Sequence, residues 1–261
     1  MPKTAWITGI GLLVVLAVAF ALAIRPPATA RGLSAVNSRP AVAPEGAVAA
    51  RTLRLLVIGG TSGIGLATVQ LALARGHLVT SMARHAPATP LTHPRLRVVQ
   101  GSIDDANAVA AALRSQDAVI ISIGLPPTRQ PTTVVSTGVA HVLEGMHAAG
   151  IERLLVITGI GAGNSRGHGG FGHDSVILPA ILGQIYADKD RAEARVRASD
   201  RQWTIVRPGF LENSAATGRY AVVSDLEGVR SGSISRADVA QYLVEAAESG
   251  VDSRATVLLT R

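Results

Sequence analysis

The stretch IYADKDRAE, residues 185 to 193, places a tyrosine and a lysine three positions apart. A Tyr-x-x-x-Lys pair on a helix is typical of enzymes that move a hydride from a nicotinamide cofactor. In that pair the lysine lowers the pKa of the tyrosine, whose hydroxyl then passes a proton to the substrate oxygen. Tyr186 and Lys189 are one residue too close for the pattern, although residues three apart share a helix face. The spacing raises the question of whether this helix carries a displaced pair or a lysine without a catalytic tyrosine.

A second stretch, VIGGTSGIG, ends one apolar run and opens a helical one. Bound phosphate needs bare backbone N–H groups at the positive end of a helix, where side chains would block its approach. A strand-to-helix turn that merely needs glycines is the alternative, but the position at a first βα junction favours a dinucleotide site. We therefore expect cofactor contacts from Gly59, Thr61, Ser62, Gly63, Ile64 and Gly65.

The identity of the cofactor is suggested by Arg84, at the end of the second predicted strand. Enzymes that use NAD place an acidic residue near this point for the ribose 2′-hydroxyl, whereas an arginine suits a 2′-phosphate. Residues 67 to 103 contain no Asp or Glu. Although a solvated surface arginine is common, the sequence favours NADP(H) over NAD(H), with Arg84 as the contact.

Two further positions follow later strands. Ser102 and Asp104 come after the third strand, where an adenine would rest, but Ser102 to Asp105 also match a capping box that opens a helix. Both interpretations stay open. Gly124 ends the fourth strand, where a small residue lets the cofactor ribose lie against the backbone; the alternative is a turn glycine before Pro126.

The glycine-rich stretch TGIGAGNSRGHGGFGHD, residues 158 to 174, predicts a flexible loop at the carboxyl edge of the sheet, where substrates bind in such folds. His168, His173 and Asp174 could be imagined as metal ligands. No rigid element fixes their geometry, so we expect a mobile loop and no metal site.

Short apolar runs alternate with helical stretches along the chain. The runs that predict strands cover residues 53–59, 77–83, 95–100, 117–124, 153–159, 203–207 and 255–260. The predicted helices cover residues 63–76, a stretch opened at Ser102, residues 131–149, residues 184–199, and a final helix capped by Ser235 and Asp238. This alternation predicts an α/β doubly wound parallel sheet, the Rossmann fold.

Composition excludes several classes of function. The 261 residues include no cysteine, which excludes disulfides and thiolate chemistry. The net charge is +7, yet no basic run interleaved with aromatic residues is present. Nucleic-acid binding is therefore not expected.

Residues 6 to 24, WITGIGLLVVLAVAFALAI, carry no charge and predict an N-terminal transmembrane helix. A cleaved signal peptide ending at the ATA of residues 28–30 is the alternative, which would make the protein secreted or periplasmic. The run is longer than a usual signal segment, and the arginines after it outnumber the one lysine before it. We therefore expect an anchor (1–24), a Pro/Ala-rich tether (25–52), and a domain (53–261) facing the cytoplasm.

Several stretches together resemble the atypical short-chain dehydrogenase/reductases, in their NAD(P)H-binding branch with flavin reductase (biliverdin-IX-beta reductase) and NmrA-like proteins. They include VIGGTSGIG, MAR, DAVIISIG, PTTVVSTGVAHVLEGMHAAGIERLLVITG, KDRAEARVRASDRQWTIVRPGFL, ATGRY and ISRADVAQYL. The resemblance covers roughly residues 53 to 261. It implies a Rossmann domain, an NAD(P)H cofactor and reductase activity.

The resemblance also answers the opening question. The branch has Lys-Asp-x-x-Glu on this helix, which Lys189, Asp190 and Glu193 match, so we expect Lys189 to contact the cofactor ribose and Tyr186 to be structural. A serine that the family commonly has after its threonine is Gly159 here, leaving Thr158 or Ser165 as sources of a hydroxyl. A histidine of flavin reductase is replaced by Phe210.

We therefore expect Lys189 and Thr158 to serve catalysis in a membrane-anchored NADPH-dependent reductase of flavins, quinones or similar small acceptors. Solvent can supply the proton for such acceptors. Residues 160–180 and 209–218 are expected to shape the acceptor pocket. The alternative is a non-catalytic NADP-binding redox sensor or assembly scaffold of the NmrA kind.

Overall fold

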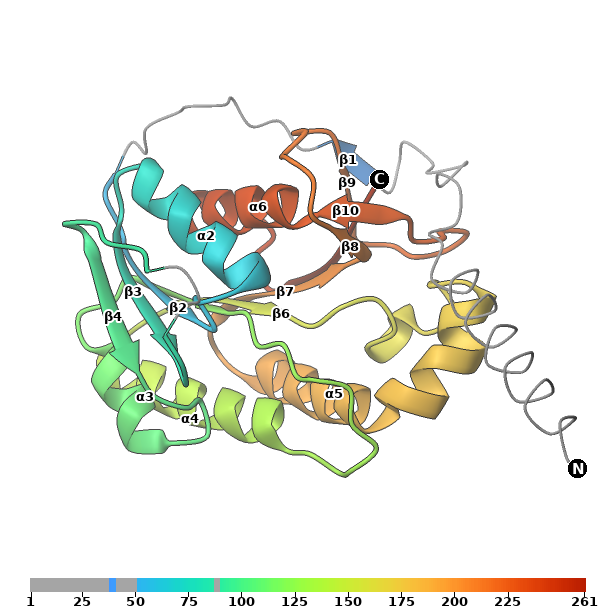
Figure 1. Ribbon diagram of the computed structural model, residues 1–261, viewed down its shortest axis with the longest axis horizontal. Coiled ribbons are helices and arrows are strands. Elements are labelled where there is room, and N and C mark those ends of the chain that lie inside the picture. The colour runs from blue at the N-terminus through green and yellow to red at the C-terminus, as the bar shows by residue number, and fades with distance from the viewer. Residues whose placement is uncertain (1–37, 41–50, 87–89) are drawn as a thin grey trace, which may run out of the picture.

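The computed structural model describes residues 38–40, 51–86 and 90–261. Its main element is a nine-stranded sheet of order β1-β9-β11-β7-β6-β5-β2-β3-β4 (Figure 1). The seven strands from β11 to β4 are all parallel. In chain order they are β2 (Arg54–Ile58), β3 (Leu78–Ala83), β4 (Leu96–Gln100), β5 (Ala118–Ile121), β6 (Arg153–Ile157), β7 (Gln202–Pro208) and β11 (Ala255–Thr260). The predicted Rossmann sheet is confirmed.

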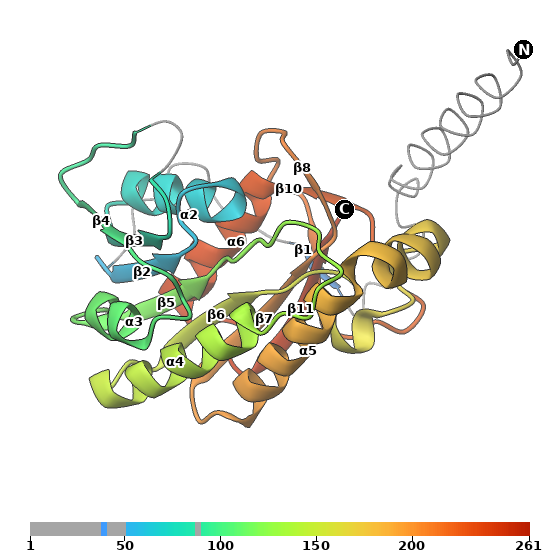
Figure 2. The ribbon, with the colours of Figure 1, turned by 60° about the horizontal axis from the view of Figure 1, so that its bottom comes forward.

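Helices cover both faces of this sheet. Figures 1 and 2 show α2 (Gly63–Ala74) and α6 (Arg236–Ser249) side by side on one face. The opposite face carries α3 (Ala106–Leu113), α4 (Val134–Ala149) and α5 (Gly183–Ala198). The chain crosses from one side of the sheet to the other after β4, so the strand order reverses at β2. Ligands of doubly wound sheets bind at the carboxyl ends of the strands beside such a reversal.

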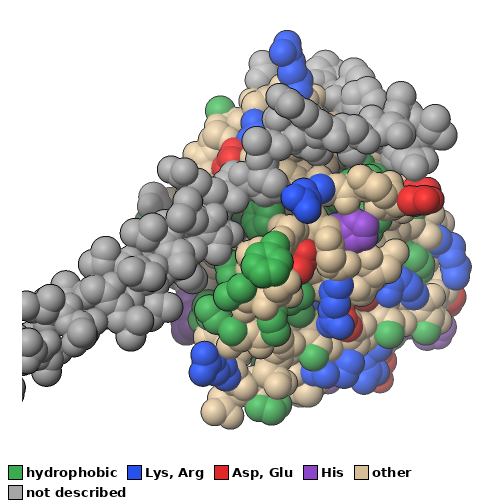
Figure 3. Space-filling view, turned by 90° about the vertical axis from the view of Figure 1, so that its right-hand side faces the viewer, with side chains coloured by type: hydrophobic (Ala, Val, Ile, Leu, Met, Phe, Trp, Pro, Cys, Tyr) green, Lys and Arg blue, Asp and Glu red, His purple; other side chains and the backbone are tan. Residues whose placement is uncertain are grey.

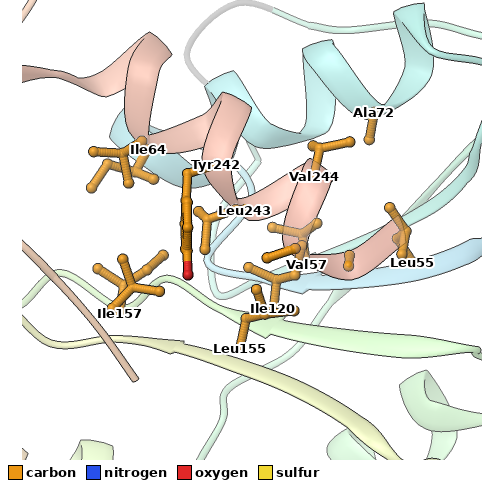
Figure 4. Close-up of a cluster of buried hydrophobic side chains, with 14 of the residues drawn as sticks. Leu55, Val57, Ile64, Ala72, Ile120, Leu155, Ile157, Tyr242, Leu243 and Val244 are labelled. Atoms are coloured by element: carbon orange, nitrogen blue, oxygen red, sulfur yellow. The ribbon is translucent and has the colours of Figure 1, made fainter. Parts of the chain in front are cut away.

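The core has one layer on each side of the sheet because successive strand side chains point to opposite faces. In β2, Leu55 and Val57 pack toward α2 and α6, and Leu56 and Ile58 pack toward α3, α4 and α5. Figure 4 shows the first layer, in which side chains from both helices meet those of β2, β5 and β6. This two-sided burial explains why these strands read as continuous apolar runs.

Two small additions lie outside the predicted pattern. At the edge of the sheet, β9 (Ala221–Val223) pairs antiparallel with β11 and with β1 (Ser38–Pro40). Part of the predicted tether therefore forms a strand. Separately, β8 (Phe210–Glu212) pairs in parallel with β10 (Ser233–Ser235), which leads directly into α6. This two-stranded sheet brings residues 210–212 beside the start of α6.

The glycine-rich stretch is more regular than the predicted mobile loop. It contains a 3₁₀ turn, η1 (Gly163–Ser165), and its last residues begin an 11-residue π-helix, η2 (Gly172–Leu182), that runs into α5. Local hydrogen bonds fix the turn: the hydroxyl of Ser165 donates to the carbonyl of Ala162 and accepts from the N–H of Gly161. The stretch is a structured wall at the carboxyl edge of the sheet.

The predicted helix boundaries hold in one case and shift in another. Ser235 caps α6 by accepting from the N–H of Asp238, as the sequence predicts. In contrast, α3 begins after Asp105, whose carboxylate accepts from the N–H groups of Asn107 and Ala108. Ser102 is therefore not the cap, because the helix begins three residues later, at Ala106, where Asp105 is next to the free N–H groups.

The predicted membrane anchor, residues 6–24, lies outside the described residues. Among the residues that the structure describes, none of the helices is both long and apolar enough to cross a bilayer.

Candidate functional site

The glycine turn joins β2 to α2 through contacts that leave no space for side chains. A Cβ atom at position 59 would lie 2.2 Å from the carbonyl oxygen of Ser122, and one at position 65 would lie 2.1 Å from the carbonyl oxygen of Gly59. Gly63 differs, because a Cβ atom at position 63 would have the Nε atom of Arg236 as its nearest neighbour, at 3.8 Å. The turn is thus packed tightly against β5 and open where α2 begins, as a phosphate-binding turn requires.

A first cavity, of about 200 Å³, lies in front of this turn. Six of the predicted cofactor-binding residues line it: Gly59, Thr61, Ser62, Arg84, Ser102 and Gly124. Ser102 does not cap a helix, and it lines this cavity where the sequence predicts the adenine of the cofactor. The structure therefore brings together residues that are separated by up to 65 positions in the chain.

The end of this cavity near β3 is cationic. Arg84 is exposed, and its backbone carbonyl accepts from the Gln100 side-chain amide, which fixes the chain there. His85 lines the cavity beside it and was not singled out from the sequence. None of the described residues lining this cavity is acidic. This is the environment that a 2′-phosphate prefers.

A second cavity, of about 580 Å³, continues from the first. The two share Ser62, Ser122, Ile123 and Gly124, and the second also reaches Gly63, Ile64, Thr158 and Lys189. Its walls are largely apolar and come from residues 157–182 and from β8, including Ile157, Ile160, Ile177, Ile181, Phe210 and Leu211. Figure 3 shows hydrophobic side chains gathered on one face of the molecule. Among the residues of this part of the chain, Phe171, Val176 and Leu211 are exposed.

Lys189 and Tyr186 lie together in this second cavity. The ammonium group of Lys189 donates to the backbone carbonyl of Thr158 and lies 4.7 Å from the centre of the Tyr186 ring. Burial lowers the pKa of Lys189 to about 8, against the opposing charge of Glu193. Burial raises the pKa of Tyr186 to about 12, and the negative charges of Asp174 and Asp190 add to this. The lysine therefore does not activate the tyrosine, whose phenol stays neutral.

Beneath the cavity floor, Glu193 is fully buried and accepts four hydrogen bonds. Arg207 donates twice, at 2.9 and 2.6 Å, Arg197 donates at 2.6 Å, and the Thr158 hydroxyl donates at 2.7 Å. Burial alone would raise the pKa of Glu193, but the hydrogen bonds and charge of Arg207, with Thr158 and Arg197, hold it below its usual value. The Thr158 hydroxyl donates to this carboxylate, so the group of Thr158 that contacts Lys189 is its backbone carbonyl.

A second buried carboxylate connects α5 to α4. Asp188 accepts from the N–H groups of Val135 and Ser136 at 2.8 and 3.2 Å, and so satisfies the first turn of α4 from a neighbouring helix. A cap supplied from 52 or 53 residues away has no local sequence signature, which is why sequence reasoning missed it.

Gly159 occupies the position where the family commonly has a serine. Its φ of +134° is one that residues with side chains rarely adopt, and a Cβ there would lie 3.2 Å from the Tyr186 hydroxyl. The glycine is therefore required by the backbone. Ser165, the other hydroxyl considered, is buried in the η1 turn and does not line the cavity.

The histidines of the glycine-rich stretch are separated. His168 contacts the carbonyl of Val229 through Nδ1 at 2.7 Å, away from the cavity. His173 is buried in η2, lines the second cavity, and pairs with Asp174. Over the described ranges, no three His, Cys, Asp or Glu side chains are placed to hold a metal ion.

Comparison with known proteins agrees with this geometry. A family described as NAD(P)H-binding matches residues 59–249. An uncharacterised chloroplastic protein of Arabidopsis thaliana is 27% identical over 206 residues, which is 76% of this chain and 73% of that protein. The structure of ChuY, an anaerobillin reductase from Escherichia coli O157:H7, is 28% identical, with a TM-score of 0.66 over 79% of this chain and 96% of that one. A short-chain dehydrogenase/reductase from Veillonella parvula, solved in complex with NADP, is 16% identical with a TM-score of 0.66, covering 81% of this chain and 95% of that one, and so shares the fold.

Proposed function

We propose, since the chain belongs to the NAD(P)H-binding family, that it is an NADPH-dependent reductase that passes a hydride to a small, largely apolar acceptor such as a flavin or a quinone. The observation that carries this proposal is the continuity of the two cavities at Ser62, Ser122, Ile123 and Gly124. A dinucleotide held at the glycine turn would extend from the first cavity into the second, where the acceptor has space.

The preference for NADPH rests on the cationic end of the first cavity. Arg84 and His85 would face the 2′-phosphate, and no acidic residue among the described lining residues would bind a 2′-hydroxyl in the manner of NAD enzymes. Arginine suits phosphate through its planar set of donors.

When bound, NADPH supplies the hydride. Lys189 would hold the nicotinamide ribose, and its own position is fixed by its hydrogen bond to the Thr158 carbonyl. The hydroxyl of Thr158 donates in turn to Glu193, which also accepts from Arg207. The apolar walls exclude water from the acceptor, and most of the rate enhancement would come from proximity and orientation.

Flavins and quinones suit this cavity because their rings are flat, uncharged and conjugated and accept a hydride readily. The likeness to an anaerobillin reductase supports a conjugated acceptor of this general kind. The neutral Tyr186 and the absence of a serine at 159 do not favour alcohol–ketone chemistry.

A non-catalytic NADP-binding sensor or scaffold is the second candidate, favoured by the same neutral Tyr186 and by Gly159. Such a protein would bind NADPH and show no turnover with added acceptors. The two candidates therefore differ in one measurable quantity, the steady-state consumption of NADPH.

We further propose that residues 6–24 anchor the protein in a membrane with the domain in the cytoplasm. The proposal is supported by the uncharged run of 19 residues and by the arginines that follow it. Comparing the mass of the mature N-terminus with the full sequence separates this proposal from cleavage near Ala30.

The first experiment is a calorimetric titration of the full chain with NADPH and with NADH, alongside Arg84→Gln and Gly63→Asp. We expect NADPH to bind at least tenfold more tightly than NADH, Arg84→Gln to remove most of that difference, and Gly63→Asp to bind neither. Equal binding of the two cofactors would refute the role of Arg84. Turnover of FMN or menadione no faster than with Gly63→Asp would favour the sensor.

A further inference from the structure

We propose that His173 is the proton donor to the acceptor in the second cavity, and that Asp174 is the residue that orients it. This inference rests on the proposed reductase function. It concerns a histidine that the sequence places in a glycine-rich stretch and that the structure places on the wall of the acceptor cavity.

The imidazole of His173 is held in one orientation. Its Nδ1 lies 2.9 Å from Oδ1 of Asp174, and the other oxygen of Asp174 accepts from the N–H of Gly169 at 2.9 Å. A carboxylate that accepts from Nδ1–H leaves Nε2 as the nitrogen that exchanges a proton. Among the described residues, no hydrogen bond to Nε2 is formed.

Aromatic side chains hold the ring from two sides. Its centroid lies 5.5 Å from that of Phe210 and 6.3 Å from that of Tyr186, both in edge-to-face arrangements. All three residues line the second cavity. The dyad also lies in the first turn of a π-helix, an element that is rare and often found at functional sites.

Other polar groups in the cavity are poorly suited to donate the proton. The phenol of Tyr186 is too weak an acid, with a pKa of about 12. Lys189 donates to the Thr158 carbonyl and, in the proposed function, is directed to the nicotinamide ribose and not to the acceptor. The guanidinium of Arg236, which donates to Asn213, does not release a proton in this pH range. The charged and titratable groups around His173 are thus the carboxylate of Asp174 on the same helix and the neutral phenol of Tyr186. The cations that line the same cavity are Lys189 and Arg236.

The step balances without a further reactant. The C4–H bond of the dihydronicotinamide breaks, and its hydride forms a new bond to the acceptor, which gains two electrons as NADPH becomes NADP⁺. The Nε2–H bond of the His173 imidazolium breaks as its proton forms an O–H bond on the reduced acceptor. Solvent then reprotonates the imidazole. A positioned general acid of this kind contributes about 10²- to 10⁴-fold to a rate.

Two acceptors separate this role from simple packing. Reduced FMN leaves the hydride step as a stable anion and needs no proton from the protein, whereas the hydroquinone anion formed from menadione is a stronger base. The full chain is therefore compared with His173→Ala and Asp174→Asn for reduction of both probes by NADPH. His168→Ala is the matched control, because His168 belongs to the same stretch and does not line the cavity.

We expect His173→Ala to lower kcat for menadione at least tenfold more than kcat for FMN, to leave the Kd for NADPH within about threefold, and to recover menadione turnover when imidazole is added. Asp174→Asn should give a smaller loss, and His168→Ala no selective loss. Equal losses with both acceptors and no rescue by imidazole would overturn the inference, as would unchanged menadione turnover. If the unaltered protein binds NADPH and reduces neither probe, the proposed function itself fails and the inference with it.

Discussion

Replacing Glu193 with glutamine tests the buried network beneath the site, because it removes the charge and keeps the size. Arg207, with 1% of its side chain exposed, would then have no buried carboxylate to neutralise it. Breaking a buried ion pair by removing one partner costs about 3–5 kcal/mol. Arg197→Ala is the control, since 39% of that side chain is exposed and its loss leaves the Glu193–Arg207 pair intact. We expect the control to cost less than about 1 kcal/mol.

The sign of the pH dependence follows from the pKa of Glu193, which is lower in the folded protein than its ordinary value of 4.5. The stability due to Glu193 is therefore complete above the unfolded pKa and is lost as the pH falls through the folded one. Urea unfolding followed by circular dichroism at pH 7 and at pH 4 measures both effects. Two results would contradict this account of the Glu193–Arg207 pair. The first is a free energy of unfolding of Glu193→Gln within about 1 kcal/mol of that of the unaltered protein at pH 7. The second is a loss of stability between pH 7 and pH 4 that is as large in Glu193→Gln as in the unaltered protein.

Three further substitutions test the geometry around the lysine. Tyr186→Phe should change kcat by less than about threefold, because a phenol with a pKa of about 12 takes no part in proton transfer, whereas loss of a general acid would cost about 10²-fold or more. Gly159→Ser should lower the free energy of unfolding by about 1–3 kcal/mol and raise no activity, because a φ of +134° strains a serine; thermal unfolding and NADPH turnover check both parts. Asp188→Ala should cost about 2 kcal/mol in urea unfolding by removing the cap of α4, whereas Arg195→Ala, an exposed change on the same helix, should stay within about 0.5 kcal/mol.

The features that the sequence predicted are those with a local cause. Strands buried on both faces appear as continuous apolar runs, so β2 and β5 could be predicted to within a few residues. The glycine turn could be predicted because its spacing and its place at a βα junction are both local. Arg84 and Gly124 followed from the same logic, since each lies shortly after the end of a strand, at the edge of the sheet where the cavity lies.

The features that escaped prediction depend on distant partners. The π-helix η2 comes at the end of a run of glycines that by itself favours disorder. Its position depends on its contacts with α5, which the local sequence does not show. Asp188 caps a helix more than 50 residues away, and His173 meets Phe210 across 37 positions. Glu193 fitted a family pattern, but the sequence did not show that it would accept from Arg207 on a separate strand.

The two perturbed pKa values in the second cavity argue together for the class of acceptor. In an alcohol dehydrogenase the lysine must lower the pKa of a tyrosine, which requires a tyrosine that can become charged. Here burial moves the pKa of Tyr186 up to about 12 and that of Lys189 down to about 8, so both groups move toward their neutral forms. A cavity that disfavours charge on its own tyrosine does not favour the proton relay of ketone reduction, and it suits the uncharged conjugated ring of the proposed acceptor. We assign the proton to a group outside that pair, His173, which lies on the wall of the same cavity and is oriented by Asp174.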